Sequence, residues 1–157
     1  MQKLTPFVEN DYIELYDYMY DIWIETFGGI ISKEHIEFLL HKYFDIGNIR
    51  QFLQNGYKYF YICDNGEKTG VLVFAERENE IFIDKLYIRK NFRGKGYSSF
   101  AVRQLQKFDK NICLNVNVNN THAVSVYKHL GFVIDKRVSI PISENMVNED
   151  YCMILKV

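Results

Sequence analysis

The chain has 157 residues, with 19 Lys and Arg against 20 Asp and Glu and a formal net charge of −1. Its length is that of about one domain, and its contents of 48% hydrophobic and 25% charged residues are ordinary for a soluble globular protein. No apolar run reaches the roughly 18 residues needed to span a bilayer, and the N-terminus lacks the apolar core of a signal peptide, so we expect a cytoplasmic protein with no membrane partner.

The first third of the chain is predicted to form one short strand and three helices. The strand covers Lys3–Val8. Asp11 is the expected N-cap of the first helix, because an acidic residue follows three positions later, and apolar residues recur at helical spacing to about Phe27. Ser32 and Asn48 are expected to begin the second and third helices.

The rest of the chain changes to short runs rich in β-branched and aromatic residues. Three such runs, separated by turn sequences, predict an antiparallel meander over residues 57–63, 70–76 and 81–88. Helix 97–109, strand 111–118 and helix 121–130 follow, and two strands near 132–140 and 151–157 close the chain. The strand–helix–strand step predicts a parallel crossover. This is an α+β, or mixed α/β, pattern, and with no linker or repeat it predicts a single domain over residues 1–157.

A glycine-rich turn after the third meander strand is the most informative segment. Arg93, Gly94, Lys95 and Gly96 lead directly into a helix. Glycine lets the backbone approach a ligand closely, and the first N–H groups of a helix have no partner within it. The helix dipole and the two basic side chains add positive charge. These features predict a turn that binds phosphate.

Two common phosphate-binding templates do not fit this turn, and a third one does. A P-loop needs glycine where Arg89 stands, and a dinucleotide-binding fingerprint needs glycine where Ser99 stands. The segment Arg93–Ser98 instead resembles R-x-x-G-x-[GA], the pyrophosphate motif of the GNAT acetyltransferase superfamily, although Ser98 departs from the usual small residue. The segment Asn120–Phe132 is similar to that superfamily's N-x-x-A-x-x-x-Y-x-x-x-G-F pattern. With both motifs in order, the chain is identified as a member of the superfamily.

The resemblance implies a central mixed sheet of about seven strands with helices on both faces. Residues 1–56 would form the acceptor side and residues 57–157 the coenzyme-binding core. Acetyl-CoA would be the co-substrate, held where strand 81–88 splays from strand 111–118, and a backbone N–H of strand 81–88 would polarise its thioester carbonyl. The residues expected to contact it are Leu86, Tyr87, Ile88, Arg93, Gly94, Lys95, Gly96, Tyr97, Ser98, Ser99, Asn120 and Tyr127.

Some of these coenzyme contacts leave alternatives open. Asn120 is either a helix cap or a ligand of the pantetheine amide, and both roles are compatible. Lys90, Lys95 and Arg103 are candidates for the 3′-phosphate, and a solvated basic face is an equally good interpretation of Arg103.

Tyr127 and Asp84 are the candidate catalytic residues. By spacing alone, Tyr127 lies on an apolar helix stripe and belongs in the core, whereas the motif implies an acid that protonates the departing thiolate. Asp84 is the first candidate for the base that removes a proton from the acceptor, and the alternative is an ion pair with a neighbouring basic residue. Glu25 and Glu80 are weaker candidates, and ordered water can replace a carboxylate.

The acceptor side is expected to be aromatic and acidic. Trp23, Phe27 and Tyr59 are the candidate contacts, with Tyr57 and Tyr61 as further ones, and core packing is the alternative for all of them. Residues 1–37 hold eight acidic and two basic residues, a net charge of −6, which favours a cationic amine. A polyamine, an amino sugar, a peptide N-terminus and a lysine all remain open.

Three functions remain to be compared. The first is N-acetyl transfer to a small-molecule or peptide amine by direct attack in a ternary complex. The second is a catalytically weak acyl-CoA sensor with the same fold. The third, nucleic-acid binding through the basic stretch Lys85–Lys110, lacks a recognition helix or a stacking motif. The resemblance leaves room for a homodimer.

No metal cofactor is expected. The chain has four His residues, and none has metal-ligand spacing to a Cys, Asp or Glu pair. Cys63, Cys113 and Cys152 lie far apart in apolar segments, as buried thiols of a reducing compartment do.

Overall fold

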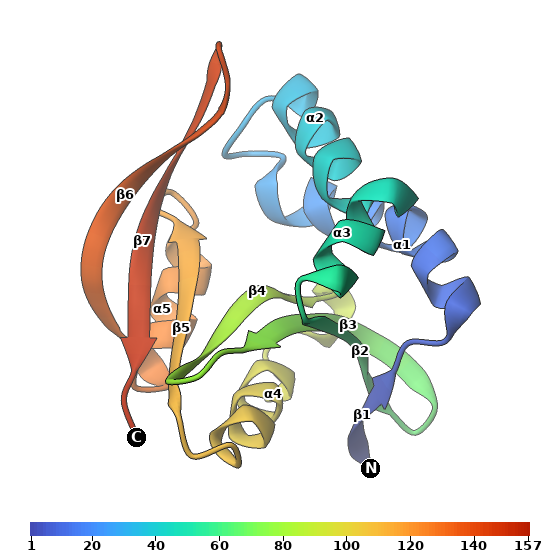
Figure 1. The fold of residues 1–157 in the computed structure, drawn as a ribbon, viewed down its shortest axis with the longest axis vertical. Coiled ribbons are helices and arrows are strands. Elements are labelled where there is room, and N and C mark those ends of the chain that lie inside the picture. The colour runs from blue at the N-terminus through green and yellow to red at the C-terminus, as the bar shows by residue number, and fades with distance from the viewer.

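A seven-stranded mixed sheet with helices on both faces organises the computed structural model, which describes residues 1–157 (Figure 1). The strands are β1 (Gln2–Pro6), β2 (Tyr57–Asp64), β3 (Glu67–Glu76), β4 (Glu80–Ile88), β5 (Asn111–Asn117), β6 (Val133–Ser143) and β7 (Met146–Leu155). The helices are α1 (Glu9–Phe27), α2 (Lys33–Phe44), α3 (Ile46–Gln54), α4 (Tyr97–Gln106) and α5 (Thr121–His129), with a 3-10 turn at Lys90–Phe92. The predicted fold class is confirmed.

The strand order across the sheet is β1-β2-β3-β4-β5-β7-β6. The strands β1 to β4 form an antiparallel meander, and β4 pairs with β5 in parallel, which confirms the predicted crossover through α4. The last strand, β7, inserts between β5 and β6 and is antiparallel to both. The sheet therefore consists of an N-terminal meander and a C-terminal three-stranded part that meet at β4 and β5.

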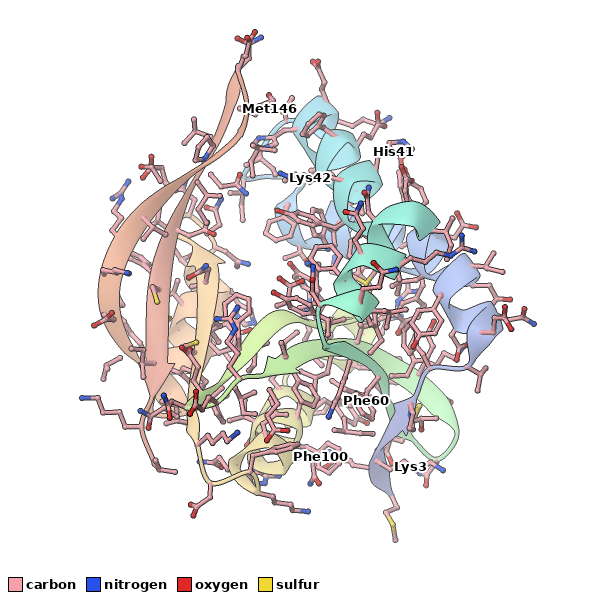
Figure 2. The ribbon with its side chains drawn as sticks, in the orientation of Figure 1. Lys3, His41, Lys42, Phe60, Phe100 and Met146 are labelled. Atoms are coloured by element: carbon pink, nitrogen blue, oxygen red, sulfur yellow. The ribbon has the colours of Figure 1, made fainter.

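Each face of the sheet has its own apolar core. On one face, α4 and α5 pack against β4 and β5 through residues such as Leu105, Tyr127 and Phe132. Figure 2 labels Phe60 of β2 and Phe100 of α4, which pack against this core. On the other face, α1, α2 and α3 cover the meander through residues such as Trp23 and Phe44. Apolar burial on both sides fixes the position of β4 in the middle of the molecule.

The N-terminal helices begin differently from the prediction at two of three positions. Ser32 is the N-cap of α2 and accepts a hydrogen bond of 3.0 Å from the His35 N–H, as predicted. Asp11 is not a cap: α1 begins at Glu9, and the Asp11 carboxylate accepts a 2.8 Å hydrogen bond from the Val8 N–H, as the third helical residue of a capping box does. Asn48 lies inside α3, where its side chain donates to the carbonyl of His41.

The C-terminal hairpin is longer than predicted. Strands β6 and β7 extend to Ser143 and back from Met146, whereas the sequence analysis left residues 141–150 outside the strands. This stretch is rich in residues that disfavour strands, including Pro141 and Asn145. Pairing of β6 with β7 and of β7 with β5 overrides that local preference. No helix of the protein is long and apolar enough to cross a membrane.

Gly70 provides a test of the close packing between β3 and β4. A Cβ at this position, opposite Ile88, would lie 2.3 Å from the Tyr87 carbonyl oxygen and 2.8 Å from Ile88 Cδ1. We expect Gly70→Ala to lower the free energy of unfolding by about 2–3 kcal/mol, because backbone atoms must move apart. Urea denaturation measures this change.

The matched control is Gly47→Ala in α3. A Cβ there meets nothing within 4 Å, so this change should raise the free energy of unfolding by about 0.5 kcal/mol. Equal stabilities for the two variants would contradict the close approach at Gly70.

Candidate active site

The strands β4 and β5 separate halfway along their length. Their parallel pairing begins at Glu80 opposite Asn111 and ends at Ile83 opposite Leu114. The register between β3 and β4 shifts at the same place, and Asp84 is the one residue of β4 left without a partner there. Such a bulge bends a strand and increases its local twist. Beyond Ile83, the edge of β4 that faces β5 is therefore unpaired.

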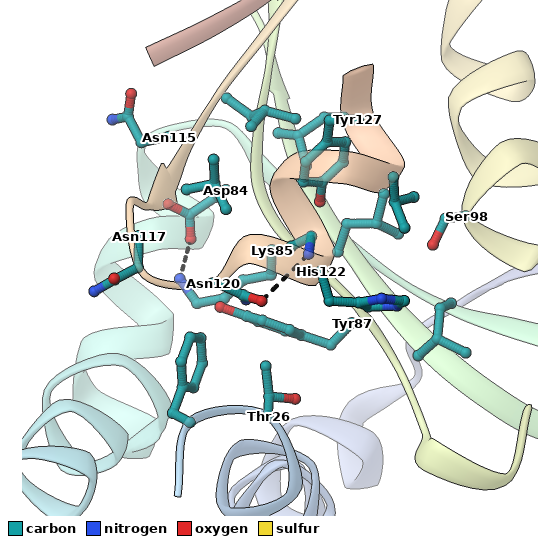
Figure 3. A pocket seen from close by; sticks show the side chains of 18 of the residues that line it. Thr26, Asp84, Lys85, Tyr87, Ser98, Asn115, Asn117, Asn120, His122 and Tyr127 are labelled. Atoms are coloured by element: carbon teal, nitrogen blue, oxygen red, sulfur yellow. Dashed lines mark hydrogen bonds and ion pairs between the residues drawn. The ribbon is translucent and has the colours of Figure 1, made fainter. Parts of the chain in front are cut away.

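A cavity of about 860 Å³ occupies this opening (Figure 3). Its walls come from both faces of the sheet: α4 and α5 on one face and α1 and α2 on the other. The cavity therefore passes between the strands from one face to the other. The predicted residues that line it are Trp23, Phe27, Asp84, Leu86, Tyr87, Ile88, Arg93, Gly94, Gly96, Tyr97, Ser98, Ser99, Asn120 and Tyr127.

The turn before α4 presents unsatisfied donors to one end of the cavity. Gly94 and Gly96 adopt the left-handed backbone conformation, with φ of 76° and 84°. The N–H groups from Gly94 to Ser99 donate to no acceptor in the protein, and α4 begins at Tyr97 without a side-chain cap. A Cβ at either glycine would meet nothing within 4 Å, so the turn is open to a ligand. It has the features of an anion site.

Two basic residues of the turn lie differently from the prediction. The Arg93 guanidinium donates from Nε to the Ile88 carbonyl at 3.1 Å and from Nη2 to Thr26 Oγ1 at 3.0 Å. Its side chain thus connects the end of β4 to α1 and does not point into the turn. Lys95 is exposed and is not part of the cavity wall; its Nζ lies 5.6 Å from the centre of the Phe92 ring.

Tyr127 of α5 and Asn120, the N-cap of that helix, both line the cavity. The Tyr127 side chain is buried, its ring makes an edge contact with Phe132, and its hydroxyl has no hydrogen-bond partner in the protein (Figure 3). Burial raises the pKa of this phenol, so it is protonated at neutral pH. Asn120 caps α5 by accepting a 3.3 Å hydrogen bond from the Ala123 N–H. The cap role predicted for Asn120 is confirmed.

Asp84 forms an ion pair with its neighbour Lys85, the arrangement left as its alternative role (Figure 3). The lysine side chain is 7% exposed and that of the aspartate 19%. The ammonium also lies 4.2 Å from the centre of the Tyr43 ring, a cation–π distance. Lys85 is absent from the predicted site residues, although a lysine beside an aspartate in a buried strand is a visible signal.

Several predicted residues do not line the cavity: besides Lys95, they are Glu25, Tyr57, Tyr59, Tyr61, Glu80, Lys90 and Arg103. The Tyr59 ring packs against Phe7 and Tyr12 in the core between the meander and the helices, so its predicted acceptor contact is wrong. Glu25 accepts a hydrogen bond from the Lys90 N–H and pairs with Arg89. Glu80 accepts a hydrogen bond from the Cys113 thiol at the opposite end of β4.

The acidic residues of the first 37 positions do not surround the cavity. None of them lines it, and several pair with basic side chains at the surface, such as Asp11 with Lys68. The carboxylates that do line the cavity are Asp84 and Asp150, both on strands. Asp150 is absent from the predicted site residues because it lies in the stretch not predicted as strand.

Residues 16–132 match the family model described as Acetyltransferase (GNAT) family. Over 101 residues the chain is 34% identical to YjbC of Bacillus subtilis, classed as an acetyltransferase, covering 64% of this chain and 45% of that protein. Over 92 residues it is 26% identical to the peptidyl-lysine N-acetyltransferase YjaB of Salmonella typhimurium, covering 59% of this chain and 61% of that protein. The matched region is thus less than two thirds of either relative's length.

The fold is similar to that of solved acetyltransferases. The PaiA N-acetyltransferase of Thermoplasma acidophilum, solved in complex with coenzyme A, superposes with a TM-score of 0.77. The superposition covers 100% of this chain and 99% of that one, at 17% sequence identity. At this identity the likeness is one of fold.

The Asp84–Lys85 ion pair can be tested by a double-mutant cycle. Lys85→Met leaves a buried carboxylate without its partner, so we expect the free energy of unfolding to fall by about 3 kcal/mol. Adding Asp84→Asn to Lys85→Met should recover about 1–2 kcal/mol, because the orphaned charge is removed. Denaturant unfolding of the wild type, both single variants and the double variant measures the coupling. Additive effects would show that the pair does not interact.

Proposed function

Because this chain belongs to the GNAT acetyltransferase family, we propose that it transfers an acetyl group from acetyl-CoA to a primary amine by direct attack in a ternary complex. The observation that carries this proposal is the cavity between β4 and β5, which joins an anion-binding turn on one face of the sheet to an aromatic chamber on the other. A cavity open to both faces lets two substrates meet without a covalent enzyme intermediate.

The coenzyme side of the cavity suits a thioester with a pyrophosphate. The unpaired edge of β4 from Leu86 to Ile88 offers N–H and C=O groups to an extended amide chain, as an added strand would use them. The free N–H groups from Gly94 to Ser99 suit the pyrophosphate, and a β4 N–H would polarise the thioester carbonyl. Gly94, Gly96, Ser98 and Ser99 line this end of the cavity, which supports the assignment.

Tyr127 would supply the proton for the leaving group. The acceptor nitrogen forms its bond to the carbonyl carbon while the carbon–sulfur bond breaks, and the phenol O–H protonates the thiolate. Burial raises the pKa of this phenol, so it holds its proton until the thiolate appears, and the phenolate left behind then takes up a proton from the solvent. Its hydroxyl has no protein partner, so it is free to take this role.

The acceptor must lose a proton before it attacks. For an ordinary ammonium with a pKa near 10.4, this loss costs about 4.6 kcal/mol at pH 7. We assign it to Asp84, which stands at the bulge beside the unpaired edge of β4, either directly or through a water molecule. The Lys85 ammonium is paired with this carboxylate and lies directly beside it.

The proposal also includes the acceptor contacts, the cellular compartment and the assembly of the protein. Trp23 and Phe27 of α1 would contact the acceptor, a cationic small molecule or a peptide amine. We place the reaction in the cytoplasm, because Cys63, Cys113 and Cys152 are all free thiols. Residues 1–157 would act as one domain, and a homodimer is a compatible assembly.

Ser98→Glu tests the anion site. At the second residue of α4, a glutamate favours the helix electrostatically, but its charge faces the position assigned to the pyrophosphate. We expect the affinity for coenzyme A, measured by calorimetry, to fall at least 100-fold, with Ser98→Ala changing it less than fivefold. Undiminished binding by Ser98→Glu would place the pyrophosphate elsewhere.

Tyr127→Phe tests the acid. We expect kcat to fall 100-fold or more with little change in coenzyme affinity, because only the proton donor is lost. Thiol release from acetyl-CoA with a panel of primary amines measures the rate. Tyr151→Phe is the control, because Tyr151 packs against the same core but is not part of the cavity wall. Tight coenzyme binding by the wild type without turnover of any amine would instead favour the sensor function.

A further inference from the structure

Asp150 is the one carboxylate of the cavity wall without a partner in the protein. Asp84 is neutralised by Lys85, and the acidic residues of α1 and α2 lie outside the cavity. Asp150 takes part in no ion pair and accepts no hydrogen bond, although it is only partly exposed. The acceptor side of the cavity therefore carries one uncompensated negative charge.

The strand pattern places Asp150 on the acceptor face of the sheet. Met153 and Tyr151 of β7 pack into the core beneath α4 and α5. Because side chains alternate along a strand, Asp150 points to the opposite face, which α1 and α2 cover. Tyr43 of α2 supports this position, because burial and then the carboxylates of Asp84 and Asp150 raise the pKa of its phenol to about 12.

Asp150 lies too far from β4 to act directly on the reacting nitrogen. It stands on β7 opposite Asn117 of β5, so two strand spacings, about 10 Å, separate its backbone from β4, where the thioester is assigned. The divergence of β4 and β5 adds to this distance. A group bound at Asp150 is therefore several atoms away from the nitrogen that is acetylated.

The wall around Asp150 suits a cation. Tyr43 and Tyr87 are close enough for its charge to act on their phenols, and the rings of Trp23 and Phe27 line the same side. Aromatic faces attract ammonium groups, and a carboxylate supplies the matching charge. Asn148, two residues before Asp150 on the same face of β7, also lines the cavity, and its Oδ1 accepts no hydrogen bond in the protein.

We propose that Asp150 binds a second positively charged group of the acceptor, so that the preferred acceptors are diamines or other amines with a distant ammonium. This assignment deepens the proposed acetyl transfer and rests on it. The ammonium donates hydrogen bonds to the Asp150 carboxylate, while the other nitrogen of the same molecule points toward Tyr127 and the edge of β4.

The negative charge of Asp150 lowers the stability of the folded protein. Burial, and then repulsion from Glu149, raises the pKa of Asp150 to about 6 from 3.8. A carboxylate whose pKa is raised in the folded state lowers the stability of that state as the pH rises from 3.8 to about 6, and the loss persists at higher pH. The charged group that acts on Asp150 is the neighbouring Glu149, whose carboxylate adds negative charge, and the Asp84–Lys85 pair of the same cavity wall brings no net positive charge. Binding of a cation at this position removes the imbalance.

The experiment compares diamines of three to six methylene groups with the amino alcohols of equal length, in which a hydroxyl replaces the second ammonium. For the wild type at pH 8, we expect kcat/KM at the best length to be at least tenfold higher for the diamine. In Asp150→Asn, KM for the diamine should rise at least tenfold and kcat/KM for the amino alcohol should stay within twofold. Asp135→Asn, the same change on an exposed part of β6, should alter neither.

Each other outcome has a definite meaning. A wild type that shows no preference for diamines, or an equal loss on both substrates in Asp150→Asn, overturns the second-charge assignment while acetyl transfer stands. A wild type that acetylates no amine defeats the proposed function itself. Loss of folding is checked by thermal unfolding, in which Asp150→Asn should melt no lower than the wild type at pH 8, because the amide removes a buried charge.

Discussion

The end of β4–β5 pairing at Ile83 and Leu114 is the constraint on which the rest of the structure depends. Up to that point, the two halves of the sheet are held by a parallel ladder and by the core beneath α4. Beyond it, the bulge at Asp84 turns β4 away while β5 stays paired with β7. Backbone N–H and C=O groups that would be paired in a continuous sheet are therefore free to bind ligands, and the opening between the strands forms the cavity.

The glycine turn, Asn120 and Tyr127 could be predicted from the sequence as parts of one site because their signals are local. Two glycines directly before a helix form a short pattern in the sequence, and the structure places both at positive φ. The spacing of Asn120 and Tyr127 along one helix is equally visible in the sequence. The bulge at Asp84 has no such pattern. It arises from strand pairing, and so do the long β6–β7 hairpin and the position of Asp150, which local propensity places in a loop.

Charge is the property that sequence counting predicted least well. The excess of acidic residues in the first 37 positions suggested an acidic acceptor site, yet those side chains are solvated or paired at the surface, as with Asp11 and Lys68. A count along the chain does not distinguish an exposed carboxylate from one that faces a cavity. The two that matter, Asp84 and Asp150, come from strands distant in sequence, and only one of them has a counter-ion within the protein.

Arg93 connects the end of β4 to helix α1. Its guanidinium is bonded both to the Ile88 carbonyl at the end of β4 and to Thr26 on α1. Any movement of this side chain toward a bound anion must give up contacts that hold the acceptor helix, and any shift of α1 must disturb the coenzyme end of β4. For the two ligands proposed above, thermodynamic linkage would make each affinity depend on the other. One side chain thus connects the end of β4 to α1, two parts of the cavity wall that belong to different segments of the chain.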